Sequence, residues 1–135
     1  MMELHDSIAE ALGTDFFGLR EGLTAQQLDY LTRARAFVDN DVLPVINDYW
    51  ERAEVPWPLI EKLGTLNLVG DTIEGYGCPP MDPLSAGLIS MELGRGDGSV
   101  GTFLGVHCGL AMKSIYKLGS EEQNQRFLPE MATLQ

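Results

Sequence analysis

Residues 82–119 read DPLSAGLISMELGRGDGSVGTFLGVHCGLAMKSIYKLG, and the helical pattern of the whole chain is clearest here. Asp82 followed by Pro83 is a helix-start signal, because a short carboxylate caps free backbone amides and proline fits the first helical position. Apolar residues at helical spacing predict the buried side of this helix: Leu84, Leu88, Met91 and Leu93. Glycines at every second position of residues 94–98 predict its end.

A second long helix is predicted directly after this turn. Ser99 is expected to cap it and Gly119 to close it. A period of 3.6 residues predicts an apolar stripe made of Phe103, His107, Leu110, Ile115 and Leu118, with Leu104 and Ala111 beside it. The longest apolar run, residues 100–112, is interrupted by His107 and is too short to cross a membrane.

Upstream, Thr24 and Gln27 have the spacing of a capping box, in which each side chain bonds the other residue's backbone amide. The helix that begins there carries a stripe through Leu28, Leu31, Ala34, Arg35, Val38, Val42, Val45 and Tyr49. Pro44 lies inside this stripe. Because proline removes a backbone donor and clashes with the preceding turn, we expect a kink or a break there.

Shorter elements fill the rest of the chain. Pro58 suits the first position of a short helix over residues 59–63, and Gly64 suits its end. Glycines and prolines in residues 71–80 predict a loop, and a second capping box at residues 120–123 predicts a last helix. No segment alternates as a strand does. The sequence therefore predicts an all-α fold, an orthogonal or up-down bundle of four to five helices.

Composition limits the partners and the compartment. The 135 residues fit one domain over residues 23–135, behind a loosely ordered N-terminal arm at residues 1–22. A formal net charge of -11 repels polyanions, so neither nucleic acid nor an anionic membrane is expected as a partner. Cys78 and Cys108 are too few for a disulfide framework. With no signal-peptide pattern, they favour the cytoplasm, or the peroxisome or mitochondrial matrix in a eukaryote.

Few side chains suggest chemistry by themselves. His107 directly precedes Cys108, but neighbouring helical residues point about 100 degrees apart. A structural or pocket-wall histidine is therefore favoured over a catalytic dyad. No residues have the spacing of zinc ligands, so no metal site is expected. Paired carboxylates such as Asp39 and Asp41 are interpreted as solvated surface.

Glycines around the second long helix leave two questions open. Residues 96–101 match the dinucleotide fingerprint G-x-G-x-x-G, but a helix precedes them where a strand belongs, so a helix–helix turn is favoured. The backbone amides of residues 99–101 could still meet an anion or a carbonyl group. Gly101, Gly105 and Gly109 lie four apart. They indicate either close approach of another backbone, which is favoured, or space for a flat or elongated ligand.

Several strings along the chain have a familiar order and spacing: DYWERAEVP (48–56), KLGTLNLVG (62–70), IEGYGCP (73–79), MELGRGDGS (91–99), GSEEQ (119–123) and FLP (127–129). With them, residues 24–134 resemble the N-terminal helical domain of the acyl-CoA dehydrogenase and acyl-CoA oxidase superfamily. The GYGC loop is most similar to the branch that holds glutaryl-CoA dehydrogenases and short-chain acyl-CoA oxidases.

This resemblance implies a flavoenzyme of three domains that holds FAD between domains and subunits, usually as a tetramer. In the family a glutamate takes the α-proton of the acyl thioester while a hydride leaves the β-carbon for the flavin. The flavin-binding strands and that glutamate lie, in the family, beyond residue 135. We therefore expect no catalytic residue in this chain, which would be a domain that is not active alone and does not bind FAD by itself.

The resemblance also implies a site. Glutaryl-CoA dehydrogenases hold the distal carboxylate of their substrate with a glutamate, an arginine and a serine, whose places here are Gly94, Gly101 and Thr102. Because the charged clamp is absent, an uncharged acyl chain is expected. Gly101, Thr102, Val106 and Leu110 are expected on the wall of the acyl pocket. The rival hypothesis is a non-catalytic helical module for interaction or oligomerisation.

Overall fold

The computed structural model describes residues 18–135, and helices are the regular structure found among them. In chain order these are η1 (Leu19–Gly22), α2 (Ala25–Phe37), η2 (Val38–Val42), α3 (Ile46–Arg52), α4 (Trp57–Thr65), α5 (Pro83–Gly96), α6 (Gly98–Leu104), η3 (Gly105–Met112), α7 (Lys113–Leu118) and α8 (Glu121–Ala132). Turn η1 is a 3-10 helix, whereas η2 and η3 are π-helical. The predicted all-α class is confirmed. Residues 1–17 of the predicted arm lie outside the described residues.

Helix α2 begins and breaks where the sequence predicts. Thr24 Oγ1 accepts a hydrogen bond from Gln27 N at 3.3 Å, and Gln27 Oε1 accepts one from Thr24 N at 2.9 Å. The helix continues as η2 and then breaks over residues 43–45, around Pro44. This break separates α3 from α2 and adds one helix to the expected bundle.

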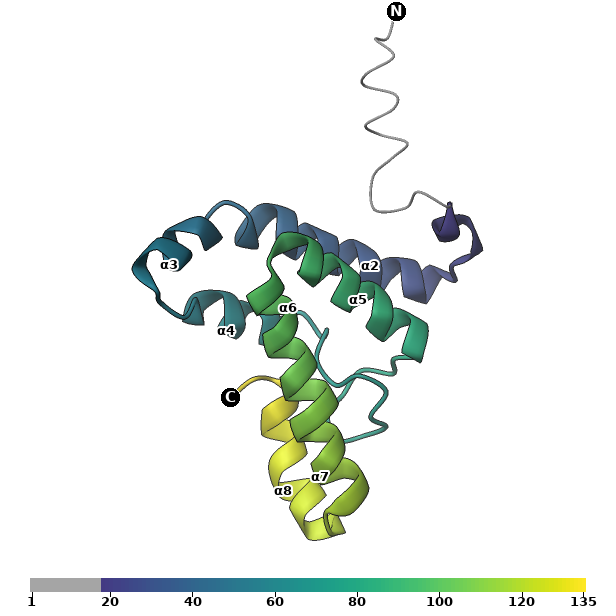
Figure 1. The fold of residues 1–135 in the computed structure, drawn as a ribbon. Coiled ribbons are helices and arrows are strands. Elements are labelled where there is room, and N and C mark those ends of the chain that lie inside the picture. The colour runs from purple at the N-terminus through teal and green to yellow at the C-terminus, as the bar shows by residue number, and fades with distance from the viewer. Residues whose placement is uncertain (1–17) are drawn as a thin grey trace, which may run out of the picture.

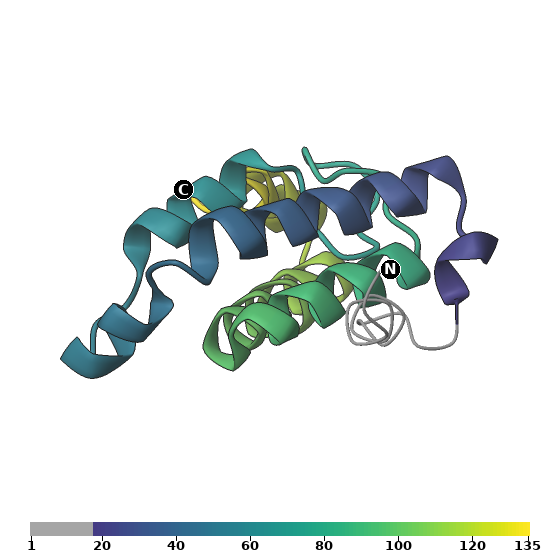
Figure 2. The same cartoon turned by 90° about the horizontal axis from the view of Figure 1, so that it is seen from above.

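Helices α2 and α5 lie side by side and run in the same direction (Figures 1 and 2). Gln27 Nε2 bonds Asp82 Oδ2 at 2.7 Å near their first turns. Near their ends, a Cβ atom on Gly96 would lie 2.6 Å from Val38 Cγ1, so the two chains touch there. The predicted Asp82 cap is confirmed by its bond from Ser85 N. Helix α4 is longer at both ends than the predicted residues 59–63.

The segments α6, η3 and α7 form one continuous rod that leaves the α2–α5 pair, and α8 folds back along it (Figure 1). The cap predicted at Ser99 is wrong, because the rod begins at Gly98 and Asp97 caps it. Gly119 closes the rod and Ser120 starts α8 with a full capping box, both as predicted. None of the helices described between residues 18 and 135 is long and apolar enough to cross a membrane.

The predicted buried side of α5 is right for Leu93 and wrong for most of the rest. Leu84 and Met91 are exposed and Leu88 is half-buried, whereas Ser85, Ile89 and Glu92 are buried together with Leu93. The rule that apolar residues mark the buried side of a helix fails here, because the buried side of α5 contains a carboxylate. Glu92 is fully buried, and it is stabilised there by Arg35, at 2.6 Å, and by Arg95, at 2.8 Å.

The predicted stripe of the rod is right only for Leu104, which is in the core, and Ile115, which packs against the core. Leu110 and Leu118 are exposed, and the core side consists of Val100, Leu104, Cys108 and Met112. These core residues recur every four positions. A π-helical segment bonds residue i to i+5 and so holds more residues in each turn than the 3.6 of the assumed α-helix.

The stripe predicted for the first helix is right in its middle and wrong at its ends. Leu31, Ala34, Val38 and Val42 are buried, as are Tyr30, Phe37 and Ile46. Leu28 and Val45 are exposed. Val45 leaves the core because the break at Pro44 starts α3 in a new phase.

Candidate functional site

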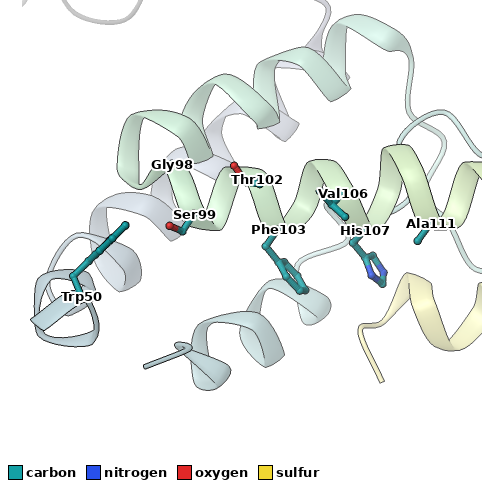
Figure 3. Close-up of a pocket in the computed structure, with 8 residues that line it drawn as sticks. All are labelled: Trp50, Gly98, Ser99, Thr102, Phe103, Val106, His107 and Ala111. Atoms are coloured by element: carbon teal, nitrogen blue, oxygen red, sulfur yellow. The ribbon is translucent and has the colours of Figure 1, made fainter. Parts of the chain in front are cut away.

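An open groove of about 870 Å³ runs between α3 and the outer side of the rod. Figure 3 shows Trp50 on one side and a row of rod side chains on the other. The lining residues are Trp50, Gly98, Ser99, Thr102, Phe103, Val106, His107 and Ala111. A second hollow of about 580 Å³ continues from it toward α4 and shares Trp50, Ser99 and Phe103. Together they make one mainly apolar channel along this side of the domain.

Along residues 100–112 of the rod, side chains of the same kind recur every four positions, and the π-helical segment keeps them on one side. The rod therefore has four rows of residues, which we call columns. The buried column is the core side already described. Beside it lies a glycine column of Gly101, Gly105 and Gly109. An exposed column contains Thr102, Val106 and Leu110, and the fourth column puts Phe103, His107 and Ala111 into the groove.

The four expected pocket-wall residues separate into three groups. Thr102 and Val106 line the groove. Leu110 is 65% exposed but lies beyond the lining. Gly101 faces α5, since a Cβ atom there would lie 3.3 Å from Gly94 N. Close backbone approach is thus the reason for this glycine, and no protein atom lies within 4 Å of a Cβ atom at Gly105 or Gly109.

Asp97 organises the start of the groove. Its Oδ1 atom accepts hydrogen bonds from Ser99 N and Val100 N, both at 2.9 Å, and its backbone oxygen accepts one from Gly101 N at 3.0 Å. Its Oδ2 atom accepts a bond from Trp50 Nε1 at 2.8 Å. All three amides of residues 99–101 are therefore satisfied within the protein. The interpretation of this helix start as a site for an anion or a carbonyl group is wrong, because a carboxylate of the chain already fills it.

His107 and Cys108 have separate structural surroundings, as their adjacency predicts. His107 stacks on Phe103, with ring centroids 5.9 Å apart, and its Nε2 donates to the backbone oxygen of Met131 at 2.9 Å. Cys108 points into the core, where its Sγ accepts a bond from Gly70 N at 3.4 Å. Burial raises the pKa of the Cys108 thiol to about 11. Such a thiol is not an activated nucleophile.

The lining of the groove does not fit FAD. A dinucleotide's diphosphate needs cations or free backbone amides. No lysine or arginine lines either hollow within residues 18–135, and the amides at the start of α6 are occupied. The same described part of the chain holds no cluster of three metal-ligating side chains. What the groove offers is an open, mainly apolar surface against which an apolar group can lie.

Of the groove lining, the sequence predicts Thr102 and Val106 as site residues but not Phe103 or Ala111, and it signals neither Trp50 nor its partner Asp97. Trp50 and Asp97 lie 47 residues apart, and their contact depends on how α3 folds against the α5–α6 turn. No local pattern signals such a pairing. Asp97 does carry a local signal, because aspartate caps a helix as well as the serine two positions later does.

Comparisons with known proteins identify the family of the chain. Residues 24–135 match the family model described as acyl-CoA dehydrogenase, N-terminal domain. A probable acyl-CoA dehydrogenase of Bacillus subtilis is 36% identical over 99 residues, which are 72% of this chain and 16% of that protein. An acyl-CoA dehydrogenase of the same organism is 30% identical over 82% of this chain and 30% of its own length.

Solved structures give the same result. A glutaryl-CoA dehydrogenase of Mycobacterium smegmatis in complex with FADH2 superposes with a TM-score of 0.82 and 36% identity, over 87% of this chain and 31% of that one. Butyryl-CoA dehydrogenase of Megasphaera elsdenii superposes with a TM-score of 0.75 and 28% identity. That match covers 82% of this chain and 30% of the other. The chain thus spans less than a third of the relatives it matches. It belongs to the acyl-CoA dehydrogenase family, as the N-terminal domain of such proteins.

Proposed function

We propose that this chain is the part of an FAD-dependent acyl-CoA dehydrogenase that forms one wall of the acyl pocket, and that the full-length protein removes hydrogen from the α and β carbons of an uncharged acyl-CoA thioester. Membership of the family supports this proposal over the rival of a non-catalytic interaction module. We assign no catalytic residue to the chain, so it is inactive alone. FAD would be bound by the full-length protein.

The observation that carries the proposal is the channel beside the rod. Its walls are apolar and aromatic, and Glu54 at its far end is the single charged side chain that lines it in the described residues. A carboxylate on the acyl chain would find no cation to pair with on this wall, as far as the described residues form it, and burying an unpaired charge is costly. An alkyl chain gains about 0.8 kcal/mol for each methylene group removed from water.

The glycines of the expected clamp support the same substrate class. Gly94 and Gly101 stand where the resemblance expects a glutamate and an arginine. Gly101 lets the rod backbone approach that of α5 at Gly94, whereas a Cβ atom on Gly94 would meet open space. Thr102 and Val106 supply groove lining next to this contact. In our proposal Gly101, Thr102, Val106 and Leu110 shape the acyl wall and exclude water from it. Electron transfer and proton abstraction belong to parts of the protein outside this chain.

The assembly and compartment are further parts of the proposal. We propose a tetramer for the full-length protein, on the resemblance, and acyl-CoA as its substrate. Location in the cytoplasm, or in the peroxisome or mitochondrial matrix of a eukaryote, is supported by the two free cysteines.

The test uses the full-length protein. Purified enzyme should be yellow, and its flavin should be reduced by butyryl-CoA or hexanoyl-CoA but not by glutaryl-CoA. Val106→Trp should lower kcat/KM more for hexanoyl-CoA than for butyryl-CoA, because it fills the groove. Leu118→Trp is the matched control, since Leu118 lies on the same rod outside the groove. Reduction by glutaryl-CoA alone, or equal effects of the two variants, would contradict the proposal.

A further inference from the structure

Two thiols that are far apart in the sequence meet at Gly70. The backbone nitrogen of Gly70 donates a hydrogen bond to Cys108 Sγ at 3.4 Å. A Cβ atom built on the same glycine would lie 2.8 Å from Cys78 Cβ and 3.0 Å from Cys78 Sγ. Gly70 has φ 129, a backbone conformation that other residues rarely adopt, so no side chain is expected there to separate the two. Both sulfurs therefore lie against one small residue.

The surrounding backbone holds this arrangement. The two residues before Gly70 are almost fully buried, so the chain reaches the glycine through the core. The residue after it, Asp71, forms an ion pair of 2.7 Å with Lys113 of the rod. The loop then turns back, and Cys78 N donates to Gly75 O at 2.9 Å in that turn. These contacts fasten the start of the loop to the rod and bring its later part back to Gly70.

The two thiols differ in their access to solvent. Cys78 is half-buried, whereas Cys108 is buried in the core. Burial is the main reason that the pKa of the Cys108 thiol is raised to about 11, and the charge of Cys78 is one of the smaller contributions. That contribution agrees with the short contacts of both side chains to Gly70. A small oxidant from solvent therefore reaches Cys78 first and finds Cys108 behind it.

We propose that Cys78 and Cys108 form a redox-modification site, at which a peroxide converts the two thiols into a reversible disulfide. First, the Cys78 thiolate attacks a peroxide oxygen and the O–O bond breaks. This step gives a sulfenic acid at Cys78, and the other oxygen takes up the thiol proton and leaves as water or an alcohol. Next, the Cys108 sulfur attacks the Cys78 sulfur, the S–O bond breaks, and the oxygen leaves as water with the Cys108 proton. The two thiols lose two electrons, which reduce the peroxide.

The shared contact with Gly70 determines what becomes of the sulfenic acid. An isolated sulfenic acid is oxidised further to a sulfinic acid, which is irreversible in most proteins. Cys108 is a poor nucleophile toward reagents in solution, but a thiol held next to the sulfenic acid reacts as an intramolecular partner. Residues 71–80 are without a helix, so the loop can make the adjustment that a disulfide requires while the rod stays in place. The bond ties the loop to the rod and protects Cys78 from irreversible oxidation.

Peroxide treatment followed by mass spectrometry tests the site. The reduced chain is treated with hydrogen peroxide, the peroxide is removed with catalase, and remaining thiols are blocked with iodoacetamide in urea. Trypsin cuts after Arg95 and so places the two cysteines on separate peptides, residues 63–95 and residues 96–113. The expected product is these two peptides joined by a disulfide within one chain, which dithiothreitol separates again. Cys78 as a sulfinic acid beside a free Cys108 would overturn the proposal, and so would a disulfide that joins two chains.

Two variants separate the proposed pairing from chance oxidation. Cys108→Ser keeps an acceptor for Gly70 N and removes the second thiol, so dimedone, which traps sulfenic acids, should label Cys78 at least about tenfold more than in the native chain. Cys78→Ser combined with Glu122→Cys is the matched control. It moves the accessible thiol to an exposed position on α8, near the far end of the rod, and should form no disulfide with Cys108 (Figure 1). Equal dimedone labelling, or a disulfide in the control as abundant as in the native chain, would contradict the role of Gly70 as their meeting point.

Discussion

The indole nitrogen of Trp50 and the carboxylate of Asp97 are joined by a hydrogen bond of 2.8 Å, which ties α3 to the turn between α5 and α6. The other oxygen of the same carboxylate caps α6 through Ser99 N and Val100 N. One side chain thus fixes the first turn of the rod and the indole that faces it across the groove.

Asp97→Ala should lower the free energy of unfolding by about 1–2 kcal/mol, because it removes a helix cap as well as the indole bond. Trp50→Phe is the matched variant: it removes the indole bond and keeps the cap, so its loss should be about 1 kcal/mol or less. Urea denaturation measures both. Equal losses for the two variants would mean that the cap contributes nothing.

Glu92 predicts how stability depends on pH. Its burial by itself would raise the pKa, but hydrogen bonds and charges from Arg35 and Arg95 outweigh that effect and lower the pKa below its usual 4.5. A carboxyl with a lowered folded-state pKa stabilises the fold above its unfolded-state pKa. That stabilisation is lost as the pH falls through the folded-state value. The native chain should therefore lose stability steeply below about pH 4.

Glu92→Gln tests this assignment. The variant should be less stable than the native chain at pH 7, by up to about 3–5 kcal/mol, since it leaves two arginines without their carboxylate. Its stability should also change less between about pH 5 and pH 3, because the titrating group is gone. Glu61→Gln, at an exposed position of α4, is the control for loss of a charge. Parallel pH profiles for the native chain and Glu92→Gln would refute the role of this carboxyl.

Helix ends were predicted well because their signals are local. The capping boxes at Thr24 and Ser120, the Asp82 cap and the Gly119 end all depend on residues within a few positions. The error at Ser99 has the same origin, since Asp97 two positions earlier takes the same donors. The residue that caps a helix is one of a few neighbours in the sequence. Choosing the wrong neighbour therefore shifts the predicted helix end by only a residue or two.

Buried faces were predicted poorly because they depend on distant partners. Helix α5 carries apolar residues on two sides, and the side with Glu92 is buried because Arg35 neutralises it from 57 residues away. The rod follows a period of four, which the assumed period of 3.6 does not detect. Thr102 and Val106 came from the family resemblance, whereas Trp50 needed the tertiary structure.

The two cysteines should differ in reactivity. Cys78 is half-buried and Cys108 is buried, and burial raises the pKa of both thiols. For Cys108 the pKa of about 11 leaves roughly a thousandth of the thiol ionised at pH 8, and the thiolate is the reactive form.

Iodoacetamide at pH 8 should therefore modify Cys78 first in the folded chain, and mass spectrometry of tryptic peptides locates the modification. In urea both thiols should react at similar rates, which controls for intrinsic differences between the peptides. Modification of Cys108 at the rate of Cys78 in the folded chain would show that the core opens around it.

Gly64 and Gly87 are both helical glycines, and alanine should have opposite effects at the two positions. A Cβ atom on Gly64 would overlap the backbone oxygen of Thr133, so Gly64→Ala must move α4 away from the end of the chain. The loss should be about 1–3 kcal/mol, as in other overpacked cores. Gly87→Ala meets open space and should stabilise the fold by about 1 kcal/mol, because alanine is the better helix former. Urea unfolding of both variants gives the signs, and a stabilising Gly64→Ala would show that α4 does not pack on residues 133–134 in solution.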